Sequence, residues 1–596
     1  MFQSFEITAR PEQGPPRLQA LRGELDREGL DGFLIPRADA HQGEYVAPRD
    51  DRLRWLTGFT GSAGFCAALR DVAGVFIDGR YRTQVKSQVA DVYSPVPWPE
   101  VSLADWLRDH LPQGGIVGFD PWLHTPGQME TLEEALTGSG IEMRRCHNLV
   151  DRIWPDQPAP PSAKARPHPI EFAGDSHDDK RARLGQTLRD AGQNAAVITL
   201  PDSHNWLLNI RGTDIARNPV AHGFAVLHGS GKVDLFMAPA KLAGLEDHLG
   251  ADVTLHDPAD MPGFLDTLPG PVRLDKQSAP VLVADILGDR VVWGDDPCAL
   301  PKACKNAAEI AGSAEAHLRD GAALVELLAW LDAQPIGSVT ETQVVSKLEG
   351  FRRSDNALQD ISFETIAGTG PNGAIIHYRV TEETDTRLED GHLLVLDSGG
   401  QYLDGTTDIT RTIAIGTPDA EARSAFTRVL AGMIAVSRLR WPKGLAGRDI
   451  EMLGRLPLWM AGQDFDHGLG HGVGAYLSVH EGPQRLSKLS HVPLLAGMIL
   501  SNEPGYYREG AFGIRIENLL VVQDAPALPG GDPQRHFLNW RTLSFAPIDR
   551  RLIDETALDG PARAWLNAYH REVSEKIGPR LSPATKLWLD AATAPI

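Results

Sequence analysis

A stretch that occurs twice in the first half of the chain places the strongest constraint on how it can fold. Residues 18–41, LQALRGELDREGLDGFLIPRADAH, and residues 181–204, RARLGQTLRDAGQNAAVITLPDSH, share one order of features. Each has an amphipathic helix pattern, a glycine, a short apolar run, a proline and an Asp-x-His ending, and Trp-Leu and further strand-like runs follow. Strands that alternate with helices are typical of α/β domains. We therefore expect two related α/β domains, one a duplicate of the other.

The length of the chain and its linkers predict three domains. Single hydrophobic cores rarely grow beyond about 250–300 residues, and this chain has 596. Segment 155–169, PDQPAPPSAKARPHP, is rich in proline and poor in apolar residues, which is typical of a linker. A second boundary is expected near 295–306, DDPCALPKACKN. The predicted domains are 1–155, 156–305 and 306–596.

The last predicted domain has a different pattern from the first two. From about residue 360, apolar runs such as AIIHYRV, HLLVLDSGG and GIRIENLLVVQ are separated by glycine turns, and two helical segments interrupt them. This pattern predicts an antiparallel sheet with helices packed on it, which is an α+β arrangement. The expected fold class is therefore multidomain, with α/β domains followed by an α+β domain.

Charge and composition exclude several classes of function. The formal net charge of −21 argues against nucleic acid as a partner, because phosphates require a basic face. No apolar run approaches the roughly 18 residues of a membrane span, and the N-terminus lacks the pattern of a signal peptide. The four cysteines are scattered and form no CxxC pair. These features predict a cytoplasmic enzyme with reduced cysteines.

The segment DHGLGHGVG, residues 466–474, carries His467 and His471 at the spacing of a helical metal-binding pair. Glycine fills every second position, and each glycine would cost a helix about 1 kcal/mol relative to alanine. We therefore expect an extended strand, on which residues two and four apart share a face. Both histidines would then point one way, and the glycines would leave room for backbone or substrate on the other side.

Four acidic residues stand at the ends of apolar runs in the last domain. Asp397 ends HLLVLD, Asp408 follows the turn GGQYLDG, Glu503 follows GMILSN, and Glu517 lies in GIRIEN. Taken singly, each is typical of a turn or a loop. In one site they would repel each other and resist ionisation unless a cation were bound. With His471 as a nitrogen donor, the set predicts two divalent ions, of which manganese suits the oxygen-rich ligands, and a hydrolytic reaction.

Several segments together resemble one known family. GGQYLDGTTDITRT, DHGLGHGVG, VHEGP, SNEPGYY and GIRIEN are similar to the signature segments of Xaa-Pro aminopeptidases of the pita-bread metallopeptidase superfamily. PRADAHQGEYV, TGFTGSAG and NWLLNIRGTDIARNPV resemble the first two domains of the three-domain aminopeptidase P type, and the tail from FAPIDRRLI resembles its C-terminal extension. The resemblance implies two creatinase-like α/β domains followed by a pita-bread catalytic domain.

The resemblance also implies a dinuclear metal site. It implies that Asp397 chelates one divalent ion, that Asp408 and Glu517 bridge both ions, and that His471 and Glu503 complete the other. Manganese is the usual metal of the family, with cobalt or zinc as alternatives. This sequence keeps all five of these residues.

Further residues are implied to act beside the metals. His377, His467 and His480 are implied as catalytic or substrate-binding residues that are not ligands. Histidine titrates near neutrality and suits proton transfer to the leaving nitrogen. Arg515 precedes Glu517 by two positions and Thr410 follows Asp408 by two, so we expect both to hydrogen-bond the ligands.

The activity implied is removal of the N-terminal residue from peptides with proline at position two, by a homodimer. Prolidase, which cleaves Xaa-Pro dipeptides, is the near alternative, although the length and the C-terminal extension argue against it. Creatinase-like enzymes lack the metal ligands, and methionine aminopeptidases lack the long N-terminal part. An inactive pita-bread domain that binds peptides would have lost ligands that are all present here.

Overall fold

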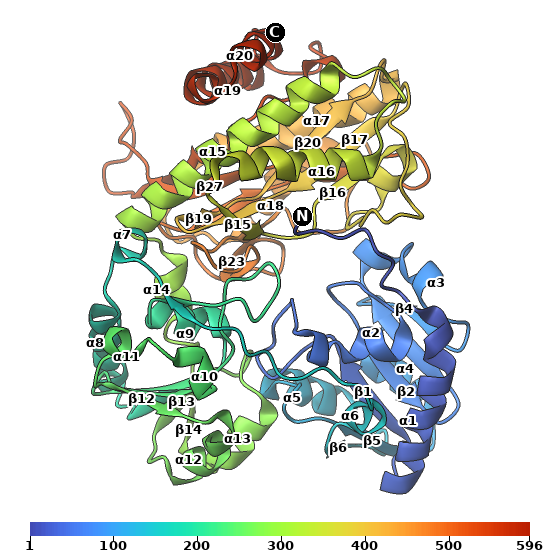
Figure 1. Cartoon of the computed structure of the whole chain (residues 1–596), viewed down its shortest axis with the longest axis vertical. Coiled ribbons are helices and arrows are strands. Elements are labelled where there is room, and N and C mark those ends of the chain that lie inside the picture. The colour runs from blue at the N-terminus through green and yellow to red at the C-terminus, as the bar shows by residue number, and fades with distance from the viewer. The chain divides into compact units, whose positions relative to one another are not determined.

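The computed structural model describes residues 1–596, and the chain folds into two compact units (Figure 1). The N-terminal unit consists of residues 8–170 and 175–299, and the C-terminal unit consists of residues 1–7, 171–174 and 300–596. The predicted domain limits at 155 and 305 remain predictions. No helix is long and apolar enough to cross a membrane.

The N-terminal unit contains two six-stranded sheets. The first has the order β4-β3-β2-β1-β5-β6 and the second has the order β12-β11-β10-β8-β13-β14. The strands of the first sheet are β1 (Gly32–Pro36), β2 (Phe65–Leu69), β3 (Ala73–Ile77), β4 (Ser94–Pro97), β5 (Gly115–Phe119) and β6 (Ile141–Arg145). Those of the second are β8 (Ala195–Ile198), β10 (Phe224–His228), β11 (Val233–Phe236), β12 (Val253–His256), β13 (Val272–Leu274) and β14 (Val291–Trp293).

The two sheets have the same topology, which confirms the duplication read from the sequence. In both, the first three strands in chain order pair antiparallel, and the other neighbours pair in parallel. Helix α1 (Gly14–Glu28) precedes β1 as α8 (His177–Asp190) precedes β8. The repeated Trp-Leu pair lies in α2 (Arg52–Thr57) and in α9 (Pro201–Leu207). The apolar runs of the repeats are the buried strands β1 and β8, because both faces of these mixed sheets carry helices.

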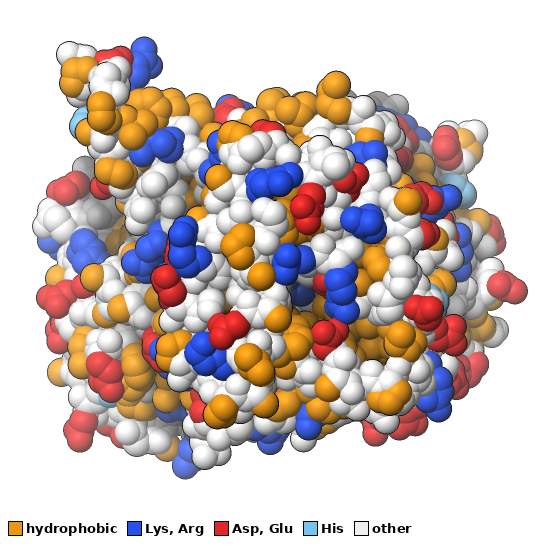
Figure 2. Space-filling view, turned by 90° about the horizontal axis from the view of Figure 1, so that it is seen from above, with side chains coloured by type: hydrophobic (Ala, Val, Ile, Leu, Met, Phe, Trp, Pro, Cys, Tyr) orange, Lys and Arg blue, Asp and Glu red, His pale blue; other side chains and the backbone are white.

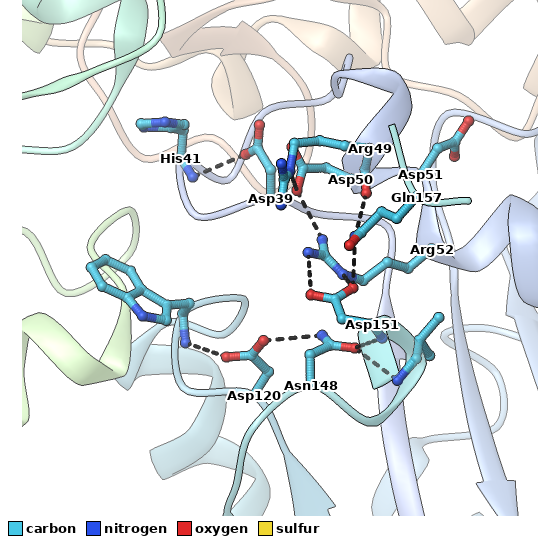
Figure 3. Close-up of polar contacts among 12 residues, drawn as sticks. Asp39, His41, Arg49, Asp50, Asp51, Arg52, Asp120, Asn148, Asp151 and Gln157 are labelled. Atoms are coloured by element: carbon cyan, nitrogen blue, oxygen red, sulfur yellow. Dashed lines mark hydrogen bonds and ion pairs between the residues drawn. The ribbon is translucent and has the colours of Figure 1, made fainter. Parts of the chain in front are cut away.

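A buried arginine links helices α2 and α6 (Leu149–Ile153), which lie beside the first sheet of the N-terminal unit (Figure 3). Arg52 of α2 donates two hydrogen bonds, of 2.7 and 3.0 Å, to Asp151 of α6. A third bond of 3.0 Å reaches Asp50. Gln157 donates to Asp151 at 2.8 Å and to the carbonyl of Arg49 at 3.0 Å. Such a forked contact fixes the angle between the two helices as well as their separation.

The C-terminal unit is built from antiparallel sheets. One sheet has the order β16-β17-β20 and another the order β21-β28-β27-β24-β22-β23, and two smaller strand groups, β15-β18-β19 and β25-β26, complete the unit. The strands are β15 (Leu358–Ile361), β16 (Ile366–Thr369), β17 (Leu393–Ser398), β18 (Gly400–Tyr402), β19 (Gly405–Thr406), β20 (Ile409–Ala414), β21 (Arg440–Pro442), β22 (Gly470–Gly472), β23 (Glu481–Leu486), β24 (Ile499–Asn502), β25 (Gly505–Arg508), β26 (Phe512–Arg515), β27 (Asn518–Asp524) and β28 (Phe537–Thr542).

Helices pack on these sheets around one hydrophobic core (Figure 1). They are α14 (Ala299–Ala303), α15 (Ala307–Asp332), α16 (Glu341–Arg352), α17 (Ala420–Ser437) and α18 (Glu451–Trp459), followed by α19 (Gly560–Ile577) and α20 (Pro583–Ala592) in the C-terminal extension. Capping boxes begin α15 at Asn306 and α16 at Thr340, which satisfies first-turn N–H groups. The α+β arrangement expected for the last domain is therefore confirmed.

Two local predictions were wrong. The run AIIHYRV was expected to be a strand, but residues 375–377 form a turn after the 3₁₀ helix Gly370–Ala374. Within DHGLGHGVG only Gly470–Gly472 is a strand, and His467 lies in the bend before it. In both places side-chain contacts compete with strand pairing, and these contacts are described below.

The glycines of β22 serve close packing of strands. A Cβ at Gly470 would lie 2.0 Å from the carbonyl oxygen of Ser501, and one at Gly472 would lie 2.3 Å from that of Glu481. Both distances are far below van der Waals contact, so only glycine fits between β23 and β24. The sequence predicted that this segment is not a helix, and the structure agrees. The backbone of the neighbouring strands occupies the space that the glycines leave.

The molecular surface carries charges of both signs. On the face drawn in Figure 2, lysine and arginine side chains are interspersed with acidic and apolar ones and do not gather in one continuous basic area. Such a mixed distribution differs from the basic stripe that nucleic-acid binding requires.

Candidate metal centre

A hairpin brings Asp397 and Asp408 to one place. Strand β17 ends at Asp397 and Ser398, and β20 begins at Ile409. The two strands are antiparallel, with Asp397 opposite Thr410, so Asp408 lies just before β20 at the same end of the pair. Both aspartates are buried. The turn between the two strands therefore folds the chain back and brings the two aspartates to the same end of the pair.

Three further residues come from the larger sheet. Glu503 directly follows β24 and Glu517 directly precedes β27, and the register of these strands pairs Asn502 with Asn518. His471 is the central residue of β22, the neighbour of β24 on its other side. Adjacent strands of one sheet therefore deliver two carboxylates and an imidazole to the same edge.

Asp408, His471, Glu503 and Glu517 surround one small volume, and Asp397 lies close enough for its charge to raise the pKa of Asp408. His471 Nε2 lies 3.3 Å from Glu503 Oε1 and 3.5 Å from Asp408 Oδ2. Donor atoms of Asp408, His471 and Glu517 lie within 4.8 Å of one another, a spacing that suits coordination of a metal ion. His471 Nδ1 is 3.0 Å from the Gly472 carbonyl, so we assign the proton to Nδ1 and the free electron pair to Nε2.

Three carboxylates of the cluster each have one oxygen that accepts no hydrogen bond. Asp397 Oδ1, Asp408 Oδ1 and Glu517 Oε1 are buried without a hydrogen-bond partner. The second oxygen of Asp397 accepts from Arg515, and that of Glu517 accepts from Thr410 at 2.8 Å. In Asp397 and Glu517 the protein therefore holds one oxygen, and in all three groups one buried oxygen is available to a cation, because buried acceptors rarely remain unpaired.

The electrostatics of the cluster also favour cations. Burial raises the pKa of Asp408 well above its ordinary value, and the charges of Asp397 and Glu503 raise it further. Burial, followed by the charges of Asp408 and Glu503, likewise raises the pKa of Glu517. The pKa of Glu503 is raised by burial, although His471 opposes the shift. Two divalent ions would balance the four carboxylates and keep them ionised.

Arg515 and Tyr507 link Asp397 to His467. Arg515 donates to Asp397 Oδ2 at 2.7 and 3.2 Å and to the Tyr507 hydroxyl at 2.6 Å. That hydroxyl lies 2.9 Å from His467 Nε2, while His467 Nδ1 contacts the Gly468 carbonyl. Burial raises the pKa of Tyr507 to about 12, so its proton remains available to donate to His467. Sequence reasoning missed Tyr507, whose signal was only the tyrosine pair in EPGYY.

His480 lies against His471, with ring centroids 4.4 Å apart and the rings nearly perpendicular. The residue after it, Glu481, is buried between two buried lysines of the same unit. Lys305 hydrogen-bonds Glu481 Oε1, and the Lys302 ammonium pairs with Oε2 at 2.9 Å without hydrogen-bond geometry. This ion cluster anchors the start of β23 and therefore the chain beside His480.

His377 lies in the turn after β16, and a buried carboxylate holds that loop. Glu341, the first residue of α16, accepts from the Thr369 amide at 2.7 Å, the Tyr378 hydroxyl at 2.8 Å and the Asn372 side chain at 3.1 Å. It also accepts from the Thr386 amide at 3.3 Å. These bonds explain why AIIHYRV does not pair as a strand. Burial raises the pKa of Glu341 to about 7.

We expect Glu341→Gln to destabilise the protein in a pH-dependent way. A buried donor left unpaired costs roughly 1–3 kcal/mol, and the amide of glutamine cannot accept at its nitrogen. Because the folded pKa of Glu341 lies above the ordinary 4.5, wild-type stability is highest below that pH and decreases as pH rises through 7. Glutamine does not titrate, so the stability gap should narrow from pH 5 to pH 8. Urea unfolding of both proteins measures the gap, and a gap independent of pH would contradict this reading.

Fold and site together define a metallohydrolase with a site for two divalent ions, and comparison with known proteins agrees. Residues 17–153 and 156–309 match creatinase/prolidase N-terminal domains. Residues 311–524 match metallopeptidase family M24, and residues 536–596 match the C-terminal region of that peptidase family.

Relatives are similar over the whole chain. Aminopeptidase P2 of Arabidopsis thaliana is 37% identical over 95% of this chain and 86% of its own length. A probable Xaa-Pro aminopeptidase P of Aspergillus niger is 36% identical over 97% of this chain and 98% of its own. The crystal structure of an X-prolyl aminopeptidase from Caenorhabditis elegans, described as a cytosolic enzyme with a di-nuclear active site, is 31% identical. It covers 98% of this chain and 100% of its own, with a TM-score of 0.93.

The chain belongs to the Xaa-Pro aminopeptidase (aminopeptidase P) family of M24 metallopeptidases. It is a metal-dependent exopeptidase with two creatinase-like domains ahead of a pita-bread domain, as the resemblance implied.

Proposed function

We propose that this protein hydrolyses the first peptide bond of peptides with proline at position two. The observation that carries the proposal is the group of Asp408, His471 and Glu517, whose donor atoms lie within 4.8 Å of one another. Three carboxylates at this place, Asp397, Asp408 and Glu517, each have one buried oxygen without a hydrogen-bond partner. The relatives named Xaa-Pro aminopeptidase, which align over nearly the full chain, support the same activity. Because the Xaa-Pro bond is a tertiary amide without an N–H, the enzyme must recognise its carbonyl and the free amino terminus.

In this proposal, Asp397 would hold one ion, His471 and Glu503 the other, and Asp408 and Glu517 both. Two divalent ions held there would polarise the scissile carbonyl and lower the pKa of a bound water molecule. Manganese suits a site with one imidazole among many oxygens, and cobalt or zinc could replace it according to supply. Thr410 and Arg515 keep Glu517 and Asp397 in fixed orientations.

The remaining side chains handle protons and the substrate. His377, His467 and His480 are the proposed donors to the carbonyl oxygen and to the leaving proline nitrogen. With Tyr507 bonded to its Nε2, His467 is held at a defined position relative to Asp397. A side chain that is already oriented costs little reorganisation during the reaction.

A substrate comparison tests the function. We expect the purified protein with added Mn²⁺ to cleave an Xaa-Pro-Pro tripeptide at least tenfold faster than the matching Xaa-Pro dipeptide, both followed by release of the first amino acid. Cleavage of the dipeptide alone would assign a prolidase. Absence of any bound or activating divalent ion would instead support an inactive peptide-binding module. Reconstitution with Mn²⁺, Co²⁺ and Zn²⁺ in parallel identifies the preferred metal.

Helix α18 and the residue after it, Met460, carry the surface that we assign to the proposed homodimer. Met452, Leu456, Trp459 and Met460 are all exposed, with Met460 at 81%. Their spacing places them on one side of the helix, and such a contiguous apolar face marks an interaction site. The scattered free cysteines and the cytosolic relative support a cytoplasmic location for the dimer.

We expect the double substitution Leu456→Glu and Met460→Glu to yield a monomer, because charges in a buried interface are strongly unfavourable. Light scattering after size-exclusion chromatography measures the mass directly. The same change at the exposed Leu528 and Leu587, which lie on other segments, should leave the mass unaltered. An unchanged mass for the α18 variant would rule out this surface as the interface.

A further inference from the structure

The C-terminal extension runs behind β20 and β27, the strands that directly follow the two proposed bridging ligands, Asp408 and Glu517. After β28, the segment 543–549 crosses the backs of β20 and β27: Ser544 Oγ accepts from the Leu519 amide, and Asp549 accepts from the Ala414 amide, both at 2.9 Å. Helices α19 and α20 (red in Figure 1) follow this segment and pack on the same core. The extension is therefore part of the C-terminal unit's sheet packing and not a separate appendage.

A buried arginine on β20 connects the extension to the site. Side chains alternate along a strand, and Thr410 and Thr412 face the candidate site, where they contact Glu517 and the Arg515 carbonyl. Arg411 therefore points to the opposite side. Its guanidinium donates to the carbonyl of Glu517 at 2.6 Å and to that of Thr410 at 2.8 Å. It thus holds the main chain of a proposed bridging ligand from behind.

The other donors of Arg411 bind the extension. They reach the carbonyls of Ala546 and Pro547 at 2.9 and 3.2 Å and the hydroxyl of Tyr569 at 2.8 Å. A further bond of 2.8 Å reaches Asn518 Oδ1, on the residue after Glu517. All these partners are neutral oxygens, so the guanidinium acts as a rigid fork that joins β20, β27 and the extension.

Tyr569 and His570 of α19 fix the extension against this fork. The Tyr569 hydroxyl accepts from the Ala546 amide at 3.2 Å and lies 3.0 Å from the Ala546 carbonyl. The ring nitrogen Nε2 of His570 accepts from the Ile548 amide at 3.1 Å. Burial lowers the pKa of His570 to about 3, so it remains a neutral acceptor at working pH. Two consecutive residues of one helix thus hold the strip of chain that Arg411 binds.

We propose that the C-terminal extension is part of the metal-binding apparatus: Tyr569, through Arg411, positions the backbone of Glu517 and so sets the separation of the two bridging carboxylates. Tyr569 and Arg411 are positioning residues, since neither touches the metals or the substrate. The inference rests on the proposed assignment of Asp408 and Glu517 as ligands. It gives a function to residues 536–596 beyond their contribution to the core.

Metal affinity tests the inference, because partners behind a ligand typically change affinity by 10–100-fold. Three full-length proteins are prepared without metal: the wild type, Tyr569→Phe and Arg411→Lys. Calorimetric titration measures the affinity of each for Mn²⁺, and thermal unfolding measures the stability of each metal-free protein. Tyr569→Phe removes only the hydroxyl and is expected to weaken at least one Mn²⁺ site about tenfold. The control is Tyr93→Phe in the N-terminal unit, where a buried hydroxyl bonds the Leu56 carbonyl at 2.8 Å. It should bind Mn²⁺ as wild type does.

The outcomes separate this inference from the proposed ligand set. Wild-type Mn²⁺ affinity in Tyr569→Phe, with a melting temperature lowered no more than in Tyr93→Phe, would overturn the role of the extension. Asp408→Asn, titrated in parallel, should lose binding. If Asp408→Asn binds both ions normally, the ligand assignment fails, and the inference built on it fails with it. If only Asp408→Asn loses binding, the ligand assignment stands and the role of the extension is wrong.

Discussion

Alanine at Asp408 is expected to abolish turnover of an Xaa-Pro-Pro peptide. Asp408 is buried, lies 3.5 Å from His471 Nε2 and shares one ligand group with His471 and Glu517. Without this carboxylate the site would hold its divalent ions poorly, and the polarisation of the scissile carbonyl and the activation of water that they would supply would be lost. We expect a fall of at least about 1,000-fold in kcat/KM, which corresponds to roughly 4 kcal/mol of transition-state stabilisation. Steady-state kinetics at saturating Mn²⁺, together with metal analysis of the purified variant, measure the effect.

Two further variants make the experiment specific. Glu517→Ala should behave like Asp408→Ala, because both carboxylates are proposed to bridge. Asp404→Ala is the matched control: Asp404 lies in the turn between β18 and β19 and pairs with Arg319, away from the ligand group. It should retain nearly full activity. Near-normal hydrolysis by either pure ligand variant would refute the assignment of the site.

Removal of the divalent ions is expected to inactivate the enzyme and to make its stability depend on pH. In the metal-free protein, burial and mutual repulsion hold the pKa values of Asp408 and Glu517 well above the ordinary 3.8 and 4.5. The folded state then binds more protons than the unfolded state above about pH 4, so the free energy of unfolding decreases as pH rises. Bound cations remove this penalty, because they replace protons as the countercharge.

Thermal unfolding from pH 5 to pH 8, with chelator and with excess Mn²⁺, checks this expectation. The melting temperature of the metal-free protein should decrease from pH 5 to pH 8. The difference in melting temperature between the protein with Mn²⁺ and the protein with chelator should be largest at pH 8. Activity should return when Mn²⁺ is added back. Equal pH profiles with and without metal would mean that the carboxylates are balanced by something other than a cation.

The fold was largely predictable because its strands and helices are encoded locally. The repeated pattern at 18–41 and 181–204 became two sheets of identical strand order. Asp397 and Glu503 follow apolar runs, Glu517 lies within one, and Asp408 comes after a turn, so the sequence places the four at strand ends or in the sheet. The expectation that Arg515 and Thr410 hydrogen-bond the ligands rested on the period of two in a strand, which pairs Arg515 with Glu517 and Thr410 with Asp408. Both contact carboxylates of the group, but Arg515 bonds Asp397 and Thr410 bonds Glu517.

The errors and omissions concern contacts between distant segments. The strand expected around His377 is a turn, because the Glu341 carboxylate of α16 accepts hydrogen bonds from amides and side chains on both sides of it. His467 lies outside β22, in a bend where its ring meets Tyr507. A capping-box pattern located the start of α16, but nothing local indicates that its first glutamate is the centre of a buried hydrogen-bond network.

The sequence by itself therefore determined the family, the duplicated N-terminal architecture and the identity of the candidate ligands. The duplicated architecture is read from periodicity and glycines in short segments. The family and the full set of candidate ligands follow from the resemblance of other short segments to the signature segments of known enzymes. Only the tertiary structure decided which oxygen of each carboxylate is free, how Tyr507 links Arg515 to His467, and that Arg411 joins the C-terminal extension to Glu517. These contacts join residues that are far apart in the chain, so they depend on strand register and on the packing of whole elements, which no local pattern encodes.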